Sequence, residues 1–306
     1  MTYVDKLKTI QKVTDKTQTE LAGLLGVSFP TLNSWLNEKS TPRKKAQEKI
    51  DLLYQEYTGI TDIDESKLTE EKKRIEKLQK SVSNPIKTII NRRDLYDSFI
   101  LELTYHTNSI EGSTLNEPEV KAVLFDNAVI PNKTMIEHQE AKNHQAALGR
   151  LFNHISDSKA TITEADIKKL HSILMNGIWQ NAGQYRTHSV RIAGSQVVTA
   201  NHVKIEELMK KFIKELNKIS TNVYSHLAVT HAQFEKIHPF SDGNGRIGRL
   251  LMHFIAVRHG LPPIIIKREK KQAYYTYLQR AQTKGEHIFL ESFICDAVLE
   301  SYKLLK

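Results

Sequence analysis

A helical hydrophobic pattern runs through almost the whole chain and leaves little of it for a sheet. From Arg92 to Leu304, apolar residues recur at spacings of three and four, which predicts a series of amphipathic helices. The pattern changes once, between residues 185 and 199. There, apolar residues flank a glycine turn: Val190, Ile192, Ala193, Gly194, Ser195, Val197 and Val198. We therefore predict an all-α fold with one β-hairpin.

The first 58 residues predict short helices joined by tight turns. Gln18–Leu25 is expected to form a helix that ends at Gly26, because glycine favours the position just past a helix. Ser28 can cap the helix that follows. Two short helices joined in this way are typical of a helix-turn-helix. We expect this module at residues 1–58, then a charged linker helix within 59–91 and a larger helical domain at 92–306.

Composition narrows the class of protein. The 306 residues are 40 % hydrophobic and 26 % charged, which is enough to build a sizeable core. The single cysteine, Cys295, excludes an intrachain disulfide and favours a reducing compartment. No apolar segment is long enough to span a bilayer, and the first ten residues lack the apolar core of a signal peptide. We expect a cytoplasmic protein with no membrane partner. Its net charge of +9 suits acidic partners such as nucleotides or DNA.

The residues with the most chemical information are 238–249, HPFSDGNGRIGR. A helix is expected to end before this window and another to begin inside it, so that the glycine amides form an anion site at a helix N-terminus. Arg246 and Arg249 lie three apart and can both face phosphate oxygens. Asp242 can hold Mg²⁺ beside phosphates, and His238 can act as a base near neutral pH. The window predicts phosphoryl or nucleotidyl transfer.

The same window resembles the signature of the Fic family, HPFxDGNGRxxR, at every fixed position. The resemblance extends over roughly Arg92 to Tyr302. It implies a compact all-helical core with a β-hairpin flap. It also implies protein adenylylation by a nucleotidyltransferase, in which AMP moves from ATP to a Ser, Thr or Tyr hydroxyl of a target protein. Mg²⁺ is the cofactor that this activity implies.

The resemblance assigns roles to matching positions. His238 would be the general base, and Asp242 would hold Mg²⁺. The target would add to the flap as an extra strand. The residues implied to bind the nucleotide are Asp242, Gly243, Asn244, Gly245, Arg246, Ile247, Gly248, Arg249, Ile192, Ala193, Gly194, Ser195, Tyr274 and Gln282. Gln282 stands where many relatives carry asparagine; it keeps the amide, so adenine is the expected base.

Residues 107–112 resemble the inhibitory motif of the family, S/T-x-x-x-E-G/N, through Thr107, Glu111 and Gly112. By that resemblance, Glu111 pairs with Arg249 and keeps it from the γ-phosphate, so the enzyme would be autoinhibited by a helix that precedes its catalytic domain. In some relatives the same glutamate supports removal of AMP from the target. The resemblance thus leaves open a bifunctional enzyme, and it also leaves open a homo-oligomer.

The N-terminal module resembles a λ-repressor-like (Cro/CI) helix-turn-helix. Its second helix would enter the major groove of DNA, with contacts from Ser28, Thr31, Asn33 and Ser34. This module is only mildly basic, and a helical module that packs against protein is the alternative for it. For the whole chain, the alternative to an enzyme is a helix-turn-helix regulator whose Fic domain senses a nucleotide or a partner.

Overall fold

The computed structural model describes residues 1–59, 65–156, 160–192, 195 and 197–305. Every regular element within these residues is an α-helix or a short 3₁₀-helix, and none is a strand, so the predicted all-α class is confirmed. None of the helices described is both long enough and apolar enough to cross a membrane. The chain divides into two compact units, Met1–Ile63 with Lys267–Leu278 and Asp64–Ile266 with Gln279–Lys306.

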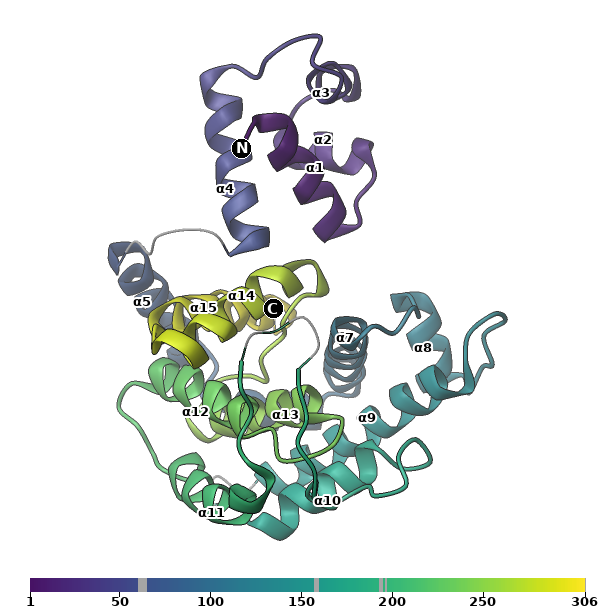
Figure 1. The fold of residues 1–306 in the computed structure, drawn as a ribbon, viewed down its shortest axis with the longest axis vertical. Helices are drawn as coiled ribbons and strands as arrows, with labels where there is room; N and C mark the ends of the chain where they lie inside the picture. Colours follow the sequence, from purple (N-terminus) through teal and green to yellow (C-terminus); the bar gives the residue numbers. More distant parts are fainter. Residues whose placement is uncertain (60–64, 157–159, 193–194, 196, 306) are drawn as a thin grey trace. The chain divides into compact units, whose positions relative to one another are not determined.

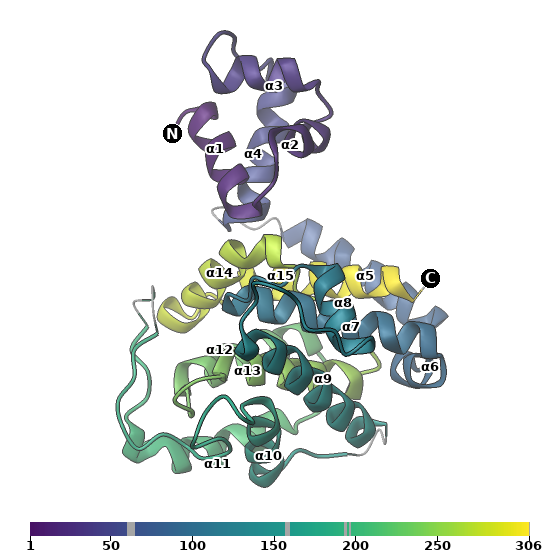
Figure 2. The same cartoon turned by 90° about the vertical axis from the view of Figure 1, so that its right-hand side faces the viewer.

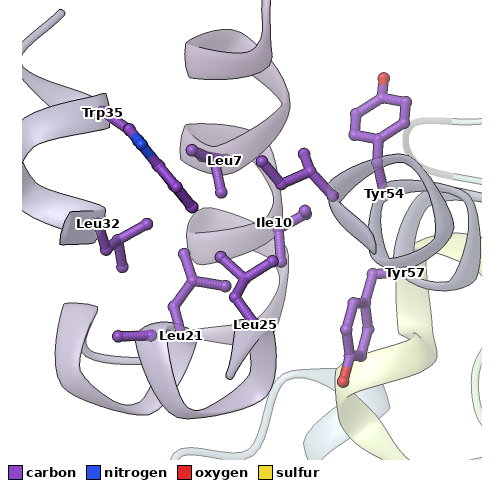
Figure 3. Close-up of a cluster of buried hydrophobic side chains, with 10 residues drawn as sticks. Leu7, Ile10, Leu21, Leu25, Leu32, Trp35, Tyr54 and Tyr57 are labelled. Atoms are coloured by element: carbon purple, nitrogen blue, oxygen red, sulfur yellow. The ribbon is translucent and has the colours of Figure 1, made fainter. Parts of the chain in front are cut away.

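Four helices make up most of the smaller unit: α1 (Tyr3–Thr14), α2 (Gln18–Leu25), α3 (Phe29–Leu36) and α4 (Lys44–Thr58). They enclose one apolar core, drawn in Figure 3, that includes Leu7, Ile10, Leu21, Leu25, Leu32, Trp35, Tyr54 and Tyr57. Gly26 adopts a left-handed conformation (φ 69°) and ends α2, and the Ser28 hydroxyl accepts a hydrogen bond from the amide of Thr31 at the start of α3. The predicted end of α2 and the predicted cap of α3 are both confirmed.

A distant segment completes the smaller unit. It contains η2 (Arg268–Lys270) and the first part of α14 (Lys271–Lys284). Arg268 pairs with Asp15 at 3.4 Å, and Lys270 pairs with Glu56 at 3.0 Å. Sequence patterns report local spacing, so they did not indicate that this late segment packs with the first helices.

The larger unit holds the remaining helices: α5 (Glu65–Ser81), α6 (Pro85–Asn91), α7 (Arg93–Glu111), α8 (Glu117–Phe125), α9 (Met135–Ile155), α10 (Glu164–Leu174), η1 (His202–Lys204), α11 (Ile205–Leu216), α12 (Val223–Ile237), α13 (Asn244–Arg258) and α15 (His287–Leu304). Nearly every residue of α13 is buried, and α7, α9, α10 and α12 contact it. Figures 1 and 2 show α12 and α13 side by side. A helix that is buried all round is a central one, so α13 is the axis of this unit.

Residues 65–91, where we expected a connecting helix, form two helices of the larger unit. On α5, Lys72 pairs with Glu291, and the Gln79 side-chain amide donates to the carbonyl of His259 at 2.6 Å. Glu291 and His259 lie about 180 to 220 residues further along the chain than their partners on α5. Packing against the C-terminal part of the unit therefore holds α5 in place.

The segment that we expected to form a β-hairpin contains no strand among its described residues. The Thr199 hydroxyl donates to the carbonyl of Val190 at 2.8 Å, and the Ser195 amide donates to the carbonyl of Ile192 at 3.2 Å. The turn residues Ala193 and Gly194 lie outside the described residues. An isolated two-stranded ribbon is only marginally stable, because it has few ladder bonds and no sheet to pack on. The hairpin stays a prediction.

Candidate active site

The loop between α12 and α13 is fixed from within by Asn244. The Asn244 Oδ1 accepts from the amide of Phe240, and its Nδ2 donates to the carbonyl of the same residue, both at 2.9 Å. His238, at the end of α12, has a left-handed backbone (φ 51°), which is uncommon for a non-glycine residue and clusters at functional sites. The buried side chain of Asn244 therefore closes the loop.

His171 of α10 supports the same loop, a role that the sequence did not suggest. Its ring stacks on Phe240 with centroids 3.8 Å apart. The Gly183 amide donates to Nδ1 at 2.7 Å, so Nε2 carries the proton and donates to the carbonyl of Asp242 at 3.0 Å. Burial lowers the pKa of His171 to about 4, so it stays neutral in this position.

Arg186 connects the predicted flap to the loop. Its guanidinium donates to four backbone carbonyls: to His238 at 2.7 Å, to His188 at 2.6 Å, to Ala200 at 2.6 Å and to Ile237 at 3.4 Å. Its own amide donates to the carbonyl of Pro239 at 2.9 Å. One buried side chain therefore fixes both ends of the predicted flap against the residues that carry the chemistry.

The His238 side chain is half-buried, at 16 % exposed, and is held in one tautomer. Its Nδ1 lies 3.2 Å from the carbonyl oxygen of Glu235, an acceptor, so Nδ1 carries the proton and Nε2 keeps its lone pair. Burial is the main reason that the pKa of His238 falls below its usual 6.5, and the positive charge of Arg186 lowers it further. A histidine that is neutral at pH 7 and has a free Nε2 is suited to accept a proton.

The N-terminus of α13 offers backbone amides to an anion. Gly243 begins the helix with φ 74°, and no side chain in the described part of the chain caps it. The Gly243 amide donates to Oδ1 of Asp242 at 2.6 Å. A Cβ atom on Gly245 would lie 2.5 Å from an Oε1 atom of Glu111. The Glu111 carboxylate therefore lies at the first turn of α13, where a bound anion is most stable.

Arg249 is held from α7 by two side chains. Its Nη2 forms an ion pair with Glu111, the last residue of α7, and its Nε donates to the hydroxyl of Thr107 at 3.2 Å. The Arg249 side chain is 2 % exposed, whereas that of Glu111 is 29 % exposed. Gly112 ends α7 in a left-handed conformation (φ 112°) directly after Glu111. The structure thus contains the contact between Glu111 and Arg249; its regulatory role stays a prediction.

Arg246 is paired with a residue that the sequence did not single out. Its Nη1 donates to Oε1 of Glu140 on α9 at 2.7 Å, and its Nη2 lies 3.9 Å from Oδ2 of Asp242. Nothing in the local pattern around Glu140 marks it as a partner, because α9 and α13 meet only in the folded chain. Arg246 is therefore charge-compensated and buried between two helices.

The other expected nucleotide-binding residues are spread over different environments. Ile247 is fully buried, and the Cα of Gly248 is packed against Glu235 and His231, so both belong to the core beneath the site. Ile192 and Ser195 are half-buried parts of the predicted flap.

Tyr274 and Gln282 belong to different units. Tyr274 is buried in the smaller unit, and its part in the nucleotide site stays a prediction. Gln282 is buried in the larger unit, where its carbonyl accepts from Lys236 Nζ at 3.0 Å. Its side-chain Nε2 makes no hydrogen bond to the described residues, so this amide donor is available to a ligand.

In the smaller unit, the four expected DNA contacts lie at the surface or just beneath it, and each already has an intramolecular bond. The hydroxyls of Ser28 and Thr31 are 2.9 Å apart, Ser34 bonds a neighbouring serine hydroxyl at 2.7 Å, and Oδ1 of Asn33 accepts from an asparagine one turn later at 2.8 Å. Phe29 is 45 % exposed beside them. This face is mixed polar and aromatic, and its role with DNA stays a prediction.

Comparisons with known proteins agree with the sequence resemblance. Residues 161–256 match the model of the Fic/DOC family. The protein adenylyltransferase Fic of Nematostella vectensis is 31 % identical over 215 residues, which cover 67 % of this chain and 48 % of that protein. The protein adenylyltransferase fic-1 of Caenorhabditis elegans is 35 % identical over 196 residues, 62 % of this chain and 38 % of that protein. The chain therefore spans about half the length, or less, of these curated relatives.

Solved structures give the same result for the fold. A Fic domain containing signaling protein from Bacteroides thetaiotaomicron superposes with a TM-score of 0.66 at 25 % identity, over 76 % of this chain and 95 % of that one. Fic-1 from C. elegans also gives 0.66, at 22 % identity, over 96 % and 86 %. We conclude that residues 161–256 match the Fic/DOC family and that the chain has homologues among the Fic protein adenylyltransferases.

Proposed function

We propose that the larger unit transfers AMP from ATP to a hydroxyl side chain of a target protein, and that Glu111 keeps it inhibited. One observation carries this proposal: a neutral, half-buried His238 lies one short loop before the uncapped N-terminus of α13, and that same helix carries Arg249, paired with Glu111. The names of the homologues point to the same reaction.

In this reaction the target hydroxyl attacks the α-phosphorus of ATP. The bond from the hydroxyl oxygen to phosphorus forms, the bond from phosphorus to the pyrophosphate oxygen breaks, and the hydroxyl proton passes to Nε2 of His238. The backbone amides of Gly243 to Arg246 would bind and orient the phosphates, because they point out of a helix N-terminus. Arg249, once released from Glu111, would neutralise the terminal phosphate.

Asp242 fits the Mg²⁺ that such a reaction uses. Its carboxylate is 54 % exposed beside the helix N-terminus, and no group of three potential ligands gathers elsewhere among the residues described. Mg²⁺ usually binds through one or two carboxylates together with substrate phosphates and water, rather than in an all-protein cage. Bound there, Mg²⁺ would neutralise phosphate charge, and Asp242 would be its protein ligand.

The inhibition follows from where the carboxylate of Glu111 lies. It occupies the first turn of α13 and engages Arg249, so a γ-phosphate would meet both a filled position and a negative charge. ATP would then bind without its α-phosphorus aligned for attack. We extend the proposal to removal of AMP from the target. In that reaction, a Glu111 that swings from Arg249 would take a proton from a water molecule. The bond from the water oxygen to phosphorus forms, the bond from phosphorus to the target oxygen breaks, and the target oxygen takes up a proton to restore the hydroxyl as AMP leaves.

The target would add a strand to the segment between His188 and Ala200, whose ends Arg186 fixes. This mode uses main-chain hydrogen bonds, so it reads little target sequence. The free side-chain amide of Gln282 would donate to the adenine base. Both assignments rest on the family resemblance together with these contacts.

The test uses ATP labelled at the α-phosphate, Mg²⁺ and a lysate of the source cells. Wild type, Glu111→Gly and Glu111→Gly/His238→Ala are compared. We expect protein-bound label to be strongest in the single variant and absent in the double variant. A subsequent chase with unlabelled ATP and wild-type protein measures removal of AMP. If ATP binds and no variant transfers label, the enzyme proposal fails.

For the smaller unit we propose DNA binding, on a specific observation at α4. Arg43 is the N-cap of this helix, no described side chain caps it, and Lys44 and Lys45 follow. All three side chains are exposed. Cations at the positive end of a helix dipole destabilise it, so this arrangement suits a bound phosphate. The surface of α3 beside Phe29 would then meet the groove.

This second proposal is tested by fluorescence anisotropy with DNA from upstream of the chain's own gene. The variant Arg43→Gln/Lys44→Gln/Lys45→Gln should bind more weakly. The slope of its log affinity against log salt concentration should be that of a protein that neutralises about three fewer phosphates. The matched control is Lys8→Gln/Lys12→Gln in the same unit, which should bind as wild type. Equal binding by the triple variant would contradict the proposal. DNA binding together with a failed transfer assay would favour a regulator that senses nucleotide.

A further inference from the structure

Glu235 lies buried between the catalytic loop and α13. It is in the last turn of α12 and is 5 % exposed. Its carboxyl Oε2 lies 3.8 Å from Nδ1 of His238, and its backbone carbonyl lies 3.2 Å from the same nitrogen. One residue thus faces the protonated side of the imidazole twice, once with its backbone and once with its side chain.

The second carboxyl oxygen is held by packing. A Cβ atom on Gly248 would have no room. Oε1 of Glu235 is in contact with the position that it would occupy, and Cε1 of His231, one helical turn before Glu235, lies 2.9 Å from that position. Glycine at 248 is therefore what allows the carboxyl to enter the space between α12 and α13. The next residue of α13 is Arg249, the partner of Glu111.

We propose that Glu235 is a positioning residue for His238 and that it connects the imidazole to the Glu111–Arg249 pair. The contact holds the Nδ1 edge of the ring against Glu235. The inference rests on the proposed function in one respect, the role of His238 as the base. The contact between Glu235 and His238 can be measured without catalysis.

The charge on Glu235 depends on its neighbours. The titratable and charged groups that face it are His231 and His238 near its own helix, Arg249 on α13 and Glu111 on α7. Burial raises the pKa of Glu235 to about 8; Glu111 also raises it, whereas Arg249 lowers it. While Glu111 is in place, the carboxyl is mostly protonated at pH 7.

Departure of Glu111 removes a negative charge that disfavours ionisation of Glu235. The positive charge of Arg249, which favours ionisation, remains. The pKa of Glu235 should therefore fall. A negative charge beside Nδ1 stabilises the imidazolium that forms when His238 accepts a proton, as an orienting carboxylate does in a catalytic triad. Release of the inhibitory contact would thus make His238 a stronger base.

The test is an NMR titration of the full chain with isotopically labelled histidine, from pH 5 to 9.5. In wild type, His238 should show its main transition below pH 6.5 and a second shift near pH 8. Glu235→Gln, which is isosteric and neutral, should abolish the second shift, and Glu111→Gly should move it to lower pH. Glu207→Gln, an exposed residue on α11, should leave both unchanged. Identical curves in wild type and Glu235→Gln would overturn the inference.

A kinetic measurement tests the consequence in the Glu111→Gly background. Adding Glu235→Gln should lower kcat above the Glu235 transition, which Glu111→Gly moves below pH 8, and should flatten the pH profile, with little change in the KM for ATP. Adding Glu235→Ala should lower kcat at every pH, because the ring loses its support. If the NMR effect is present and none of the variants transfers AMP, the positioning contact stands and the proposed function fails. Thermal melts confirm that each variant folds.

Discussion

Arg249 of α13 and Glu111 of α7 form an ion pair across 138 residues of sequence, with the arginine side chain almost completely buried. A buried guanidinium needs a compensating charge, since the cost of leaving it unpaired is several kcal/mol. The pair therefore does two things at once: it satisfies Arg249 in the resting protein, and it fills the anion position at the N-terminus of α13. An anionic ligand can take over both roles.

Replacing Glu111 with glycine should increase AMP transfer. A charge-assisted hydrogen bond contributes about 1.5–3 kcal/mol, so we expect a rate increase of roughly 10- to 150-fold at subsaturating ATP. The measurement is the initial rate of label transfer to protein. Glu117→Gln, an exposed glutamate at the start of α8, is the control and should behave as wild type. No increase in the presence of a competent target would argue against inhibition by Glu111.

Thr107→Val should give a smaller increase in the same assay. The hydroxyl accepts a hydrogen bond from the charged Arg249 Nε at 3.2 Å but carries no formal charge itself, so we take the low end of the range for bonds to charged groups, about 1.5 kcal/mol. We expect a rise of roughly tenfold. Thr104→Val, one turn earlier on α7 and bonded to His144 instead, should leave the rate unchanged. An effect of Thr107→Val as large as that of Glu111→Gly would mean that α7 itself had moved.

Arg186→Gln should separate the predicted flap from the catalytic loop. Four backbone carbonyls lose their donor, and a buried one costs about 1–3 kcal/mol when left unpaired; those of the exposed His188 and the half-buried Ala200 cost less. We expect a lower melting temperature and faster hydrogen exchange in peptides containing His188 or Ala200. Transfer in the Glu111→Gly background should fall by at least tenfold. Arg191→Gln, which is exposed, provides the control; exchange equal to wild type in Arg186→Gln would count against this linking role.

Stability should depend on pH in two opposite ways. Burial lowers the pKa of His231 and of His253 to about 3, so the folded state does not take up the protons that the unfolded chain binds below pH 6.5. The free energy of unfolding should therefore fall as the pH drops, by up to about 1.4 kcal/mol per pH unit for each histidine.

Glu235 acts in the other direction. Because its pKa is raised to about 8, the folded state keeps a proton that the unfolded chain loses above pH 4.5, so its contribution weakens as the pH rises from 4.5 to 8. Glu235→Gln should therefore gain stability relative to wild type between pH 5 and pH 8. Urea unfolding at several pH values measures both effects. A constant difference between the two proteins would show that Glu235 titrates normally.

Local rules were enough to place several elements correctly. Ser28 caps α3 and Gly26 ends α2, since capping depends on residues within one helical turn. The window 238–249 was recognised because its glycines, acid and arginines are contiguous in sequence. The pattern also placed the start of the second helix within that window, and α13 begins at Asn244.

Other features needed contacts between distant segments. Glu140 compensates Arg246, His171 supports the loop beside Asp242, and Arg186 binds carbonyls on both sides of the predicted flap. None of these partners stands at a spacing that a helix or turn imposes. Asn244 is the reverse case: its position in the motif suggested contact with a ligand, yet its side chain is used to close the loop.

The sequence by itself determined the helical class, the residue types of the loop after α12 and those of the predicted inhibitory motif, because each depends on neighbouring residues. Only the tertiary structure shows that Glu235 meets His238 and that Glu140 meets Arg246, and it contains the Glu111–Arg249 pair that the family resemblance implied. Packing buries Glu235 and Arg249, whereas His238 is half-buried and Glu111 is exposed. Burial and proximity set protonation, and they arise from packing α7 and α12 against α13, which no local pattern encodes.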